Sequence, residues 1–335
     1  MEQVALDGKV LSRALDRFEN DRRRREEETR RLRRKLYGLD PAIEELDARL
    51  RATVALAAAN ALSGGGDPVK AVEAIQEENL ALQEQRARRI ANLGYPRDCI
   101  DDLPLCPHCG DRGYVGTKPC SCLMRYYAQE QKKELSRLLD LQGESFESFR
   151  LDYYDQRPDG ETGISPRQHM QMVQLACRRY AETFANTGEN LLLSGAPGLG
   201  KTFLSACIAS VVSDRGYSVV YDTALNVCAR FEEARFGRRG DMDAAEADVR
   251  RYLNCDLLIL DDLGTELTTA YTVSVFYELI NSRMRSGKST VISTNLSSEE
   301  ISRRYSPQIA SRLEGAYENL KFYGQDIRLL KKAEG

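Results

Sequence analysis

The sequence predicts an α/β fold in which parallel strands alternate with helices, preceded by an N-terminal region that is almost entirely helical. Three stretches support this prediction. An apolar strand at 191–193 runs into a glycine-rich turn and a helix, the apolar run 257–260 ends in two aspartates, and the run 290–294 ends beside an asparagine. Strands as apolar as these are typical of a parallel sheet whose two faces are both covered by helices.

Composition and charge favour a soluble protein without a general affinity for nucleic acid. The 335 residues carry a formal net charge of −3, so any contact with nucleic acid must come from a local basic patch. No run of about 18 apolar residues is present, and the N-terminus lacks the pattern of a signal peptide. We therefore expect a cytoplasmic protein whose cysteines stay reduced.

The first hundred residues predict a helical hairpin or small bundle. Apolar residues recur at helical spacing from Leu6 to Phe18, and a run of mixed Arg and Glu follows. Asp40 and Pro41 predict the start of a second helix, a glycine-rich turn at 63–68 separates it from a third, and Gly94 helps to end that third helix. The charged run is either a solvated helix or a docking surface for a partner.

Four cysteines that lie close together in the sequence predict a metal site. They have the spacing C-x2-C-x10-C-x-C and are Cys106, Cys109, Cys120 and Cys122. Four thiolates suit tetrahedral Zn²⁺ in a closed, structural site, although reduced thiols or an iron–sulfur cluster are alternatives. A helix at 123–141 is expected to link this zinc knuckle to the rest of the chain.

The stretch after the first strand has the pattern G-x-x-x-x-G-K-T of a P-loop. Glycines let backbone N–H groups turn toward phosphates, and a helix N-terminus adds free donors. Lys201 supplies a positive charge, and the hydroxyl of Thr202 is a ligand for Mg²⁺. We expect ATP to be held by eight residues, namely Gly195, Pro197, Gly198, Leu199, Gly200, Lys201, Thr202 and Phe203.

The two later strands supply the groups that an ATP hydrolase needs beside its P-loop. Asp261 is expected to hold Mg²⁺ through water, and Asp262 to polarise the attacking water as general base. Asn295 is expected to orient that water. Arg312 is a candidate arginine finger for the ATP of a neighbouring subunit, or else a surface salt-bridge residue. Arg328, expected in a closing strand, is a candidate phosphate sensor.

The segment between the second strand and the paired aspartates combines arginines with aromatic residues. Such a combination can bind single-stranded nucleic acid through phosphates and stacking, but it is equally typical of an exposed loop between helices. The candidate residues are Phe231, Arg235, Phe236, Arg238 and Arg239.

The order of these motifs resembles that of bacterial and phage helicase loaders of the DnaC/DnaI type, which are AAA+ ATPases. The form D-D-L-G-T-E and the segment at 276–283 are similar to the loader/IstB branch. The resemblance implies a five-stranded parallel sheet with helices on both faces. Only about forty residues follow Asn295, which leaves no room for a full lid domain. The resemblance also implies a homo-oligomer that binds a replicative helicase and single-stranded DNA. In this oligomer, Arg312 of one subunit would contact the ATP of the next.

We therefore expect three segments: a helical partner-docking domain at 1–100, a zinc knuckle and linker at 101–145, and an ATPase domain at 146–335. Their expected cofactors are ATP, Mg²⁺ and Zn²⁺. Two other functions fit the same ATPase motifs. One is an IstB-like helper of a transposase, and the other is a nucleotide-dependent binding module with little hydrolysis.

Overall fold

The computed structural model describes residues 6–63, 68–138, 145–158, 163–185 and 188–334. The chain forms two compact units, which we name by their main structure. The helical unit comprises Asp16–Cys120, and the sheet unit comprises Met1–Leu15 together with Ser121–Gly335. The division into segments 1–100, 101–145 and 146–335 stays a prediction. No described helix has the length and hydropathy needed to cross a membrane.

In the helical unit, the predicted helix boundaries are confirmed. α1 ends at Leu39, α2 begins at Pro41, and α3 ends two residues before Gly94. The centre of the predicted turn, 64–67, lies outside the described residues. The elements are α1 (Gly8–Leu39), of which the part up to Leu15 belongs to the sheet unit, α2 (Pro41–Ser63), α3 (Pro68–Asn92), β1 (Tyr114–Val115) and β2 (Lys118–Pro119). A small core of buried Leu36, Ile43, Ile90 and Ile100 holds the ends of the helices together.

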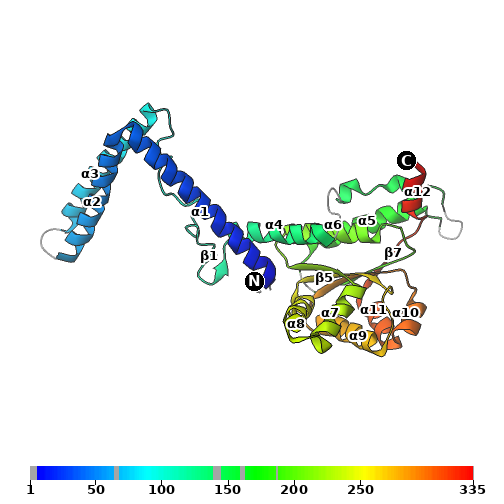
Figure 1. The fold of residues 1–335 in the computed structure, drawn as a ribbon. Coiled ribbons are helices and arrows are strands. Elements are labelled where there is room, and N and C mark those ends of the chain that lie inside the picture. The colour runs from blue at the N-terminus through cyan, green and yellow to red at the C-terminus, as the bar shows by residue number, and fades with distance from the viewer. Residues whose placement is uncertain (1–5, 64–67, 139–144, 159–162, 186–187, 335) are drawn as a thin grey trace. The chain divides into compact units, whose positions relative to one another are not determined.

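The sheet unit contains the predicted five-stranded parallel sheet (Figure 1). Its strands lie in the order β4-β5-β6-β3-β7, and every pairing in it is parallel. They are β3 (Leu191–Ser194), β4 (Val219–Thr223), β5 (Leu257–Leu263), β6 (Ser289–Thr294) and β7 (Glu318–Lys321). Because all strands are parallel, their carboxyl ends meet along one edge of the sheet.

Helices cover both faces of the sheet, as expected (Figure 1). Side chains alternate along each strand, so Leu191 and Leu193 pack toward one layer while Leu192 packs toward the other. The first layer holds α4 (Ser121–Leu138), α5 (Pro166–Thr183) and α6 (Lys201–Asp214). The second holds α7 (Ala224–Phe236), α8 (Arg239–Asn254), α9 (Ala270–Arg285), α10 (Ser298–Arg304) and α11 (Pro307–Ala316).

Short elements complete the sheet unit. Two 3₁₀ turns, η1 (Phe146–Ser148) and η2 (Leu151–Tyr153), precede α5, which begins with a capping box formed by Ser165 and Gln168. Among the described residues, α12 (Ile327–Glu334) is the helix that follows β7.

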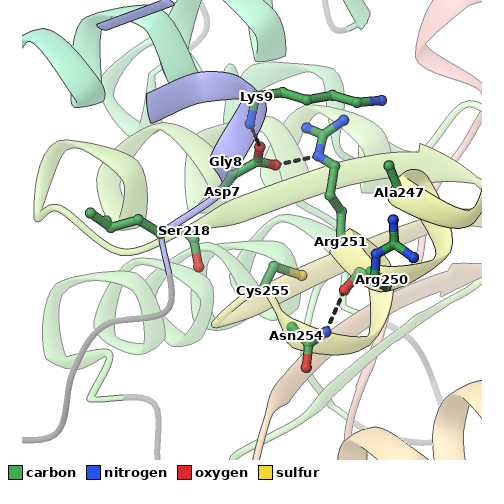
Figure 2. Close-up of a pocket in the computed structure, with 10 residues that line it drawn as sticks. Asp7, Gly8, Lys9, Ser218, Ala247, Arg250, Arg251, Asn254 and Cys255 are labelled. Atoms are coloured by element: carbon green, nitrogen blue, oxygen red, sulfur yellow. Dashed lines mark hydrogen bonds and ion pairs between the residues drawn. The ribbon is translucent and has the colours of Figure 1, made fainter. Parts of the chain in front are cut away.

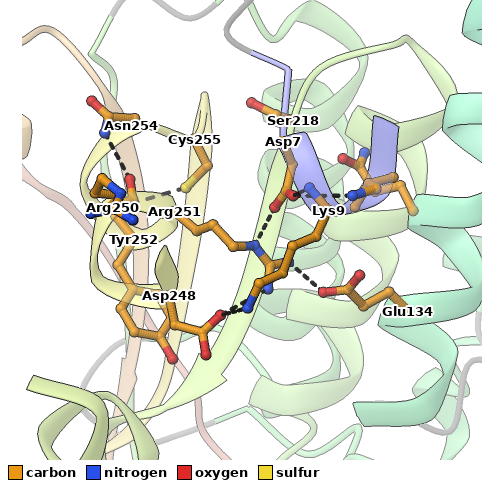
Figure 3. Close-up of polar contacts among 12 residues, drawn as sticks. Asp7, Lys9, Glu134, Ser218, Asp248, Arg250, Arg251, Tyr252, Asn254 and Cys255 are labelled. Carbon is orange, nitrogen blue, oxygen red and sulfur yellow. Dashed lines mark hydrogen bonds and ion pairs between the residues drawn. The ribbon is translucent and has the colours of Figure 1, made fainter. Parts of the chain in front are cut away.

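The first turn of α1 is attached to the sheet unit by a network of ion pairs. Asp7 accepts hydrogen bonds from the backbone N–H groups of Lys9 (2.8 Å) and Val10 (3.2 Å), and its other oxygen accepts from Arg251 of α8. Arg251 also pairs with Glu134 of α4 (Figure 3). A cavity of about 400 Å³ lies between the N-terminal segment and α8, and Arg250 and Arg251 line it (Figure 2). The segment that precedes α1 therefore belongs with the sheet.

Replacement of Arg251 should destabilise the sheet unit. Its side chain is only 19% exposed, and Arg251→Met would leave the buried carboxylate of Asp7 without its cation and Glu134 with Arg13 in place of two guanidinium partners. We expect the free energy of unfolding to fall by about 2–4 kcal/mol. The neighbouring Arg250 is 63% exposed and forms an ion pair along its own helix with Glu246, so Arg250→Met should cost about 0.5 kcal/mol or less. Urea unfolding of both full-length variants tests this, and equal losses would contradict the stabilising role of the network.

Candidate nucleotide-binding site

The three predicted motifs meet at the carboxyl edge of the sheet around a cavity of about 400 Å³. The P-loop follows β3, the paired aspartates end β5, and Asn295 follows β6. This edge is where ligands bind in open α/β sheets. The residues that line the cavity are Ser148, Phe149, Arg150, Tyr153, Pro197, Gly198, Leu199, Gly200, Lys201, Thr202, Phe203, Asp262, Asn295, Ile327, Arg328 and Lys331.

The P-loop can be built only with glycine at two of its positions. Gly195 has φ of 145° and Gly198 has φ of 75°. A Cβ atom on Gly195 would lie 2.6 Å from the carbonyl oxygen of Phe322, and one on Gly198 would lie 1.9 Å from Asp326 Oδ1. The loop is further held where the backbone N–H of Ile327 donates to the carbonyl of Gly198 at 3.0 Å. The loop shape is therefore fixed before any ligand binds.

Lys201 at the start of α6 uses the three N–H donors of its ammonium group on two loop carbonyls and one side-chain amide. Its Nζ donates to the carbonyls of Gly195 (2.6 Å) and Ala196 (2.8 Å) and to Oδ1 of Asn295 (2.7 Å). Burial lowers the pKa of Lys201, although the nearby carboxylates of Asp262 and Asp261 oppose that shift. Phosphate oxygens are stronger acceptors than these neutral carbonyls, so a bound triphosphate competes for the same N–H groups.

Asp261 is almost fully buried beside Thr202, so the two predicted Mg²⁺ residues lie together. Thr202 Oγ1 donates to Asp261 Oδ2 at 3.0 Å. The same oxygen accepts from Tyr221 at 2.6 Å, and Oδ1 accepts from the hydroxyl of Ser293. A hydroxyl oxygen and a carboxylate oxygen that lie side by side are suitable ligands for Mg²⁺.

Asp262 reaches the cavity because the strand is irregular there. The pairing of β5 with β6 shifts between Leu260 and Leu263, and Asp262 has φ of 54°. Its backbone N–H donates to Ser293 Oγ at 2.9 Å. Burial and the adjacent Asp261 raise the pKa of Asp262, which makes it a stronger base than an ordinary aspartate.

The two predicted arginines have different surroundings. Arg328 lines the cavity, and its charge favours the ionised form of Asp262. The prediction that it lies in a closing strand is wrong, because β7 closes the sheet earlier and Arg328 stands at the start of α12. Arg312 is absent from this cavity. It lies on α11, where its guanidinium donates to the hydroxyl of Tyr277 at 3.0 Å and stacks over that ring.

The four predicted metal ligands also lie together. The Sγ atoms of Cys106, Cys109, Cys120 and Cys122 all lie within 4.8 Å of one another. The antiparallel pair β1–β2 brings the second two cysteines back toward the first two. Thiolates at this spacing fit the tetrahedral shell of Zn²⁺, in which sulfur atoms stand about 2.3 Å from the metal.

The aromatic candidates for nucleic-acid binding separate into one buried and one exposed residue. Phe231 is 9% exposed and stacks on Tyr252 within the core, so its predicted role in stacking on bases is wrong. Phe236 is 69% exposed and packs beside Tyr271, with Arg235 over both rings. Arg238 is exposed, whereas the side chain of Arg239 lies outside the described residues.

Several residues at the cavity were not predicted from the sequence. Phe149, Arg150 and Tyr153 come from the two 3₁₀ turns, and Lys331 comes from α12. The turns carry no glycine pattern or charge cluster that points to a ligand. Their only signal is the close sequence position of two aromatic residues and an arginine, and that is also typical of a core edge.

The part of the chain that builds this site is similar to known proteins. Residues 164–312 match the family described as IstB-like ATP binding protein. The replicative helicase loader DnaC of Escherichia coli (strain K12) is 26% identical over 136 residues, which is 41% of this chain and 54% of that protein. A putative insertion sequence ATP-binding protein of Sinorhizobium fredii is 33% identical over 141 residues, or 42% of this chain and 41% of that protein.

This chain thus spans about half the length of the curated relatives it matches. Among solved structures, the crystal structure of the DnaC helicase loader is similar with a TM-score of 0.42 and 22% identity, covering 53% of this chain and 98% of that one. The resemblance to the DnaC/DnaI and IstB group of P-loop ATPases, which the order of the motifs predicts, is confirmed by the similarity of the central sheet unit.

Proposed function

We propose that this protein is an ATP-dependent loader of a replicative DNA helicase. The observation that carries the proposal is the meeting of the P-loop, Asp262 and Asn295 around one cavity, with the buried Asp261 bonded to Thr202 of the cavity wall. The helicase client is inferred from relatives that are named helicase loaders. We infer that the helical unit holds the client and that ATP hydrolysis in the cytoplasm controls its release.

Each group at the cavity has a role in hydrolysis of ATP. Lys201 would turn its N–H groups from loop carbonyls to the phosphates, and Thr202 and Asp261 would hold Mg²⁺, which would neutralise charge on the phosphates. Asp262 accepts a proton from the attacking water, and Asn295 orients that water. We assign Arg312 to the ATP of a neighbouring copy, because it lies outside the cavity of its own chain.

Contacts with single-stranded DNA are assigned to the exposed cluster of Arg235, Phe236 and Arg238. The exposed ring of Phe236, with the guanidinium of Arg235 over it, can stack on bases while the arginines contact phosphates. Zinc is assigned to the four cysteines, where it would act as a structural ion.

A second function has its own support, because the matching family and the Sinorhizobium fredii relative both concern insertion-sequence ATP-binding proteins. On that reading the client is a transposase. The cysteine cluster and the long helical region favour the loader, since they lie outside the part of the chain that the family describes. A third candidate, a binding module with little hydrolysis, would release no phosphate from ATP with or without single-stranded DNA.

The client can be identified with the full-length chain as bait. We expect the replicative helicase of the host to co-purify and to be released by ATP with single-stranded DNA. Lys201→Ala should retain the helicase without releasing it, because the loop then lacks the cation that grips the phosphates. Mass spectrometry of the bound fraction makes the measurement, and recovery of a transposase in place of a helicase would decide for the second function.

The rate of hydrolysis should depend on the protonation of Asp262. Because its pKa is raised, kcat/KM should begin to fall at a higher pH than the ordinary aspartate pKa of about 3.9 would give, and the loss should grow as pH decreases. Asp262→Asn should keep ATP binding and lower kcat by roughly 100-fold or more. A phosphate-release assay across pH tests both, and an unchanged kcat in the variant would remove Asp262 from the role of base.

The cysteine cluster should hold about one Zn²⁺ per chain. Cys109→Ser should lose the metal, and a strong chelator should lower the thermal stability of the wild type, because a structural site contributes its binding energy to folding. Cys99→Ser is the matched control, since Cys99 lies in the helical unit like Cys109 but does not belong to the cluster. Elemental analysis of purified chains makes the measurement, and iron in place of zinc would favour the iron–sulfur alternative.

A further inference from the structure

The carboxylate of Asp261 is held by hydroxyl groups from three different elements. Thr202 belongs to the P-loop helix α6, whereas Tyr221 lies on β4 and Ser293 on β6. No ATPase motif of the sequence includes Tyr221. Its place follows from the register of β4 and β5, in which Thr223 pairs with Asp261 and Tyr221 pairs with Ile259. Tyr221 is thus the diagonal neighbour of Asp261 on the same face, a distance that an aromatic side chain can span.

Tyr221 acts only as a hydrogen-bond donor here. Its side chain is 6% exposed, and its hydroxyl lies against a carboxylate oxygen of Asp261, so the phenol supplies the hydrogen of this bond. The oxygen–oxygen distance of 2.6 Å is that of a strong bond from a neutral hydroxyl to a carboxylate. The carboxylate of Asp261 is therefore oriented from the edge of the sheet as well as from the P-loop.

The hydrogen bonds to Asp261 leave one of its acceptor positions open. A carboxylate has about four lone-pair positions. Among the described residues, Oδ2 accepts from Thr202 and Tyr221, and Oδ1 accepts from Ser293 alone. One position on Oδ1 remains for a further donor, such as a water molecule.

We propose that Tyr221 is a positioning residue for Mg²⁺: its hydroxyl fixes the rotation of Asp261 so that the remaining acceptor position meets a water of the metal bound to ATP. The inference rests on the nucleotide binding proposed above and adds a residue that the motifs do not contain. Without the phenol, Oδ2 keeps only Thr202, and the carboxylate gains freedom to turn its open position away from the metal.

The chain offers a close control for this proposal on a neighbouring element. Tyr252 of α8 is 3% exposed, and its hydroxyl also donates to a carboxylate at 2.6 Å, in this case Asp222 of β4. Neither Tyr252 nor Asp222 lines the nucleotide cavity. Tyr252→Phe and Tyr221→Phe therefore delete the same atom from the same kind of buried bond, but only the second bond reaches Asp261.

The experiment measures binding of a fluorescent ATP analogue to the full-length chain, first in EDTA and then over a Mg²⁺ titration. Tyr221→Phe should bind the nucleotide normally in EDTA. It should need about a tenfold higher Mg²⁺ concentration to reach half of the increase in nucleotide affinity that Mg²⁺ produces. Tyr252→Phe should match the wild type in both conditions. Urea unfolding of the two variants reports any general loss of stability separately.

Two results would overturn the proposal. One is that Tyr221→Phe needs the same Mg²⁺ concentration as the wild type. The other is that Tyr221→Phe binds the nucleotide more weakly by the same factor in EDTA and in Mg²⁺, which marks a purely structural role. Both differ from failure of the proposed function, in which the wild-type chain itself binds no nucleotide.

Discussion

The site depends on one extra residue in β5. The strand pairs with β6 in register as far as Leu260 and resumes at Leu263, and Asp262 stands between them with φ of 54°. In a regular strand, adjacent side chains point to opposite faces, so Asp261 and Asp262 would not serve one cavity. The bulge leaves Asp261 buried beside α6 and turns Asp262 into the cavity. A left-handed aspartate costs about 1–2 kcal/mol, and the bond from its N–H to Ser293 offsets part of that cost.

Two buried charged groups of the sheet unit, the N-terminal network and Asp261, are satisfied in opposite ways. At the N-terminal network, carboxylates meet the guanidinium of Arg251, so the charges cancel within the protein. At Asp261, the hydrogen-bonding partners among the described residues are neutral hydroxyls. These bonds satisfy the oxygen atoms without removing the negative charge. The first arrangement stabilises the fold, and the second keeps an anion available for a cation that arrives with the ligand.

The sequence predicted the parts of the site whose geometry is local. Positive φ at Gly195 and Gly198 and the free donors at the start of α6 follow from residue types that are close in the chain, so the P-loop pattern was sufficient. The sheet and the helices that flank it followed from apolar runs and capping residues such as Ser165.

Contacts between distant segments were not predictable in this way. Tyr221 and Ser293 reach Asp261 only because of strand order and register, and no pattern in the sequence gives either. The sequence around Phe231 contains arginines, which favours an exposed position. The residue nevertheless faces the core, because one helix can carry arginines on one face and a buried aromatic ring on the other. Arg328 was assigned to a strand because a short run such as D-I-R-L fits either a strand or the first turn of a helix.

The close approach of Gly198 to Asp326 links the P-loop to the tail of the chain. No side chain fits at position 198 while a carboxylate stands at position 326, and the neighbouring Ile327 is bonded to the same glycine. A larger residue at position 198 would therefore have to displace the side chain of Asp326, which stands directly before α12. The conformation of the P-loop and the start of α12 are thus coupled mechanically, even though positions 198 and 326 are separated by more than a hundred residues.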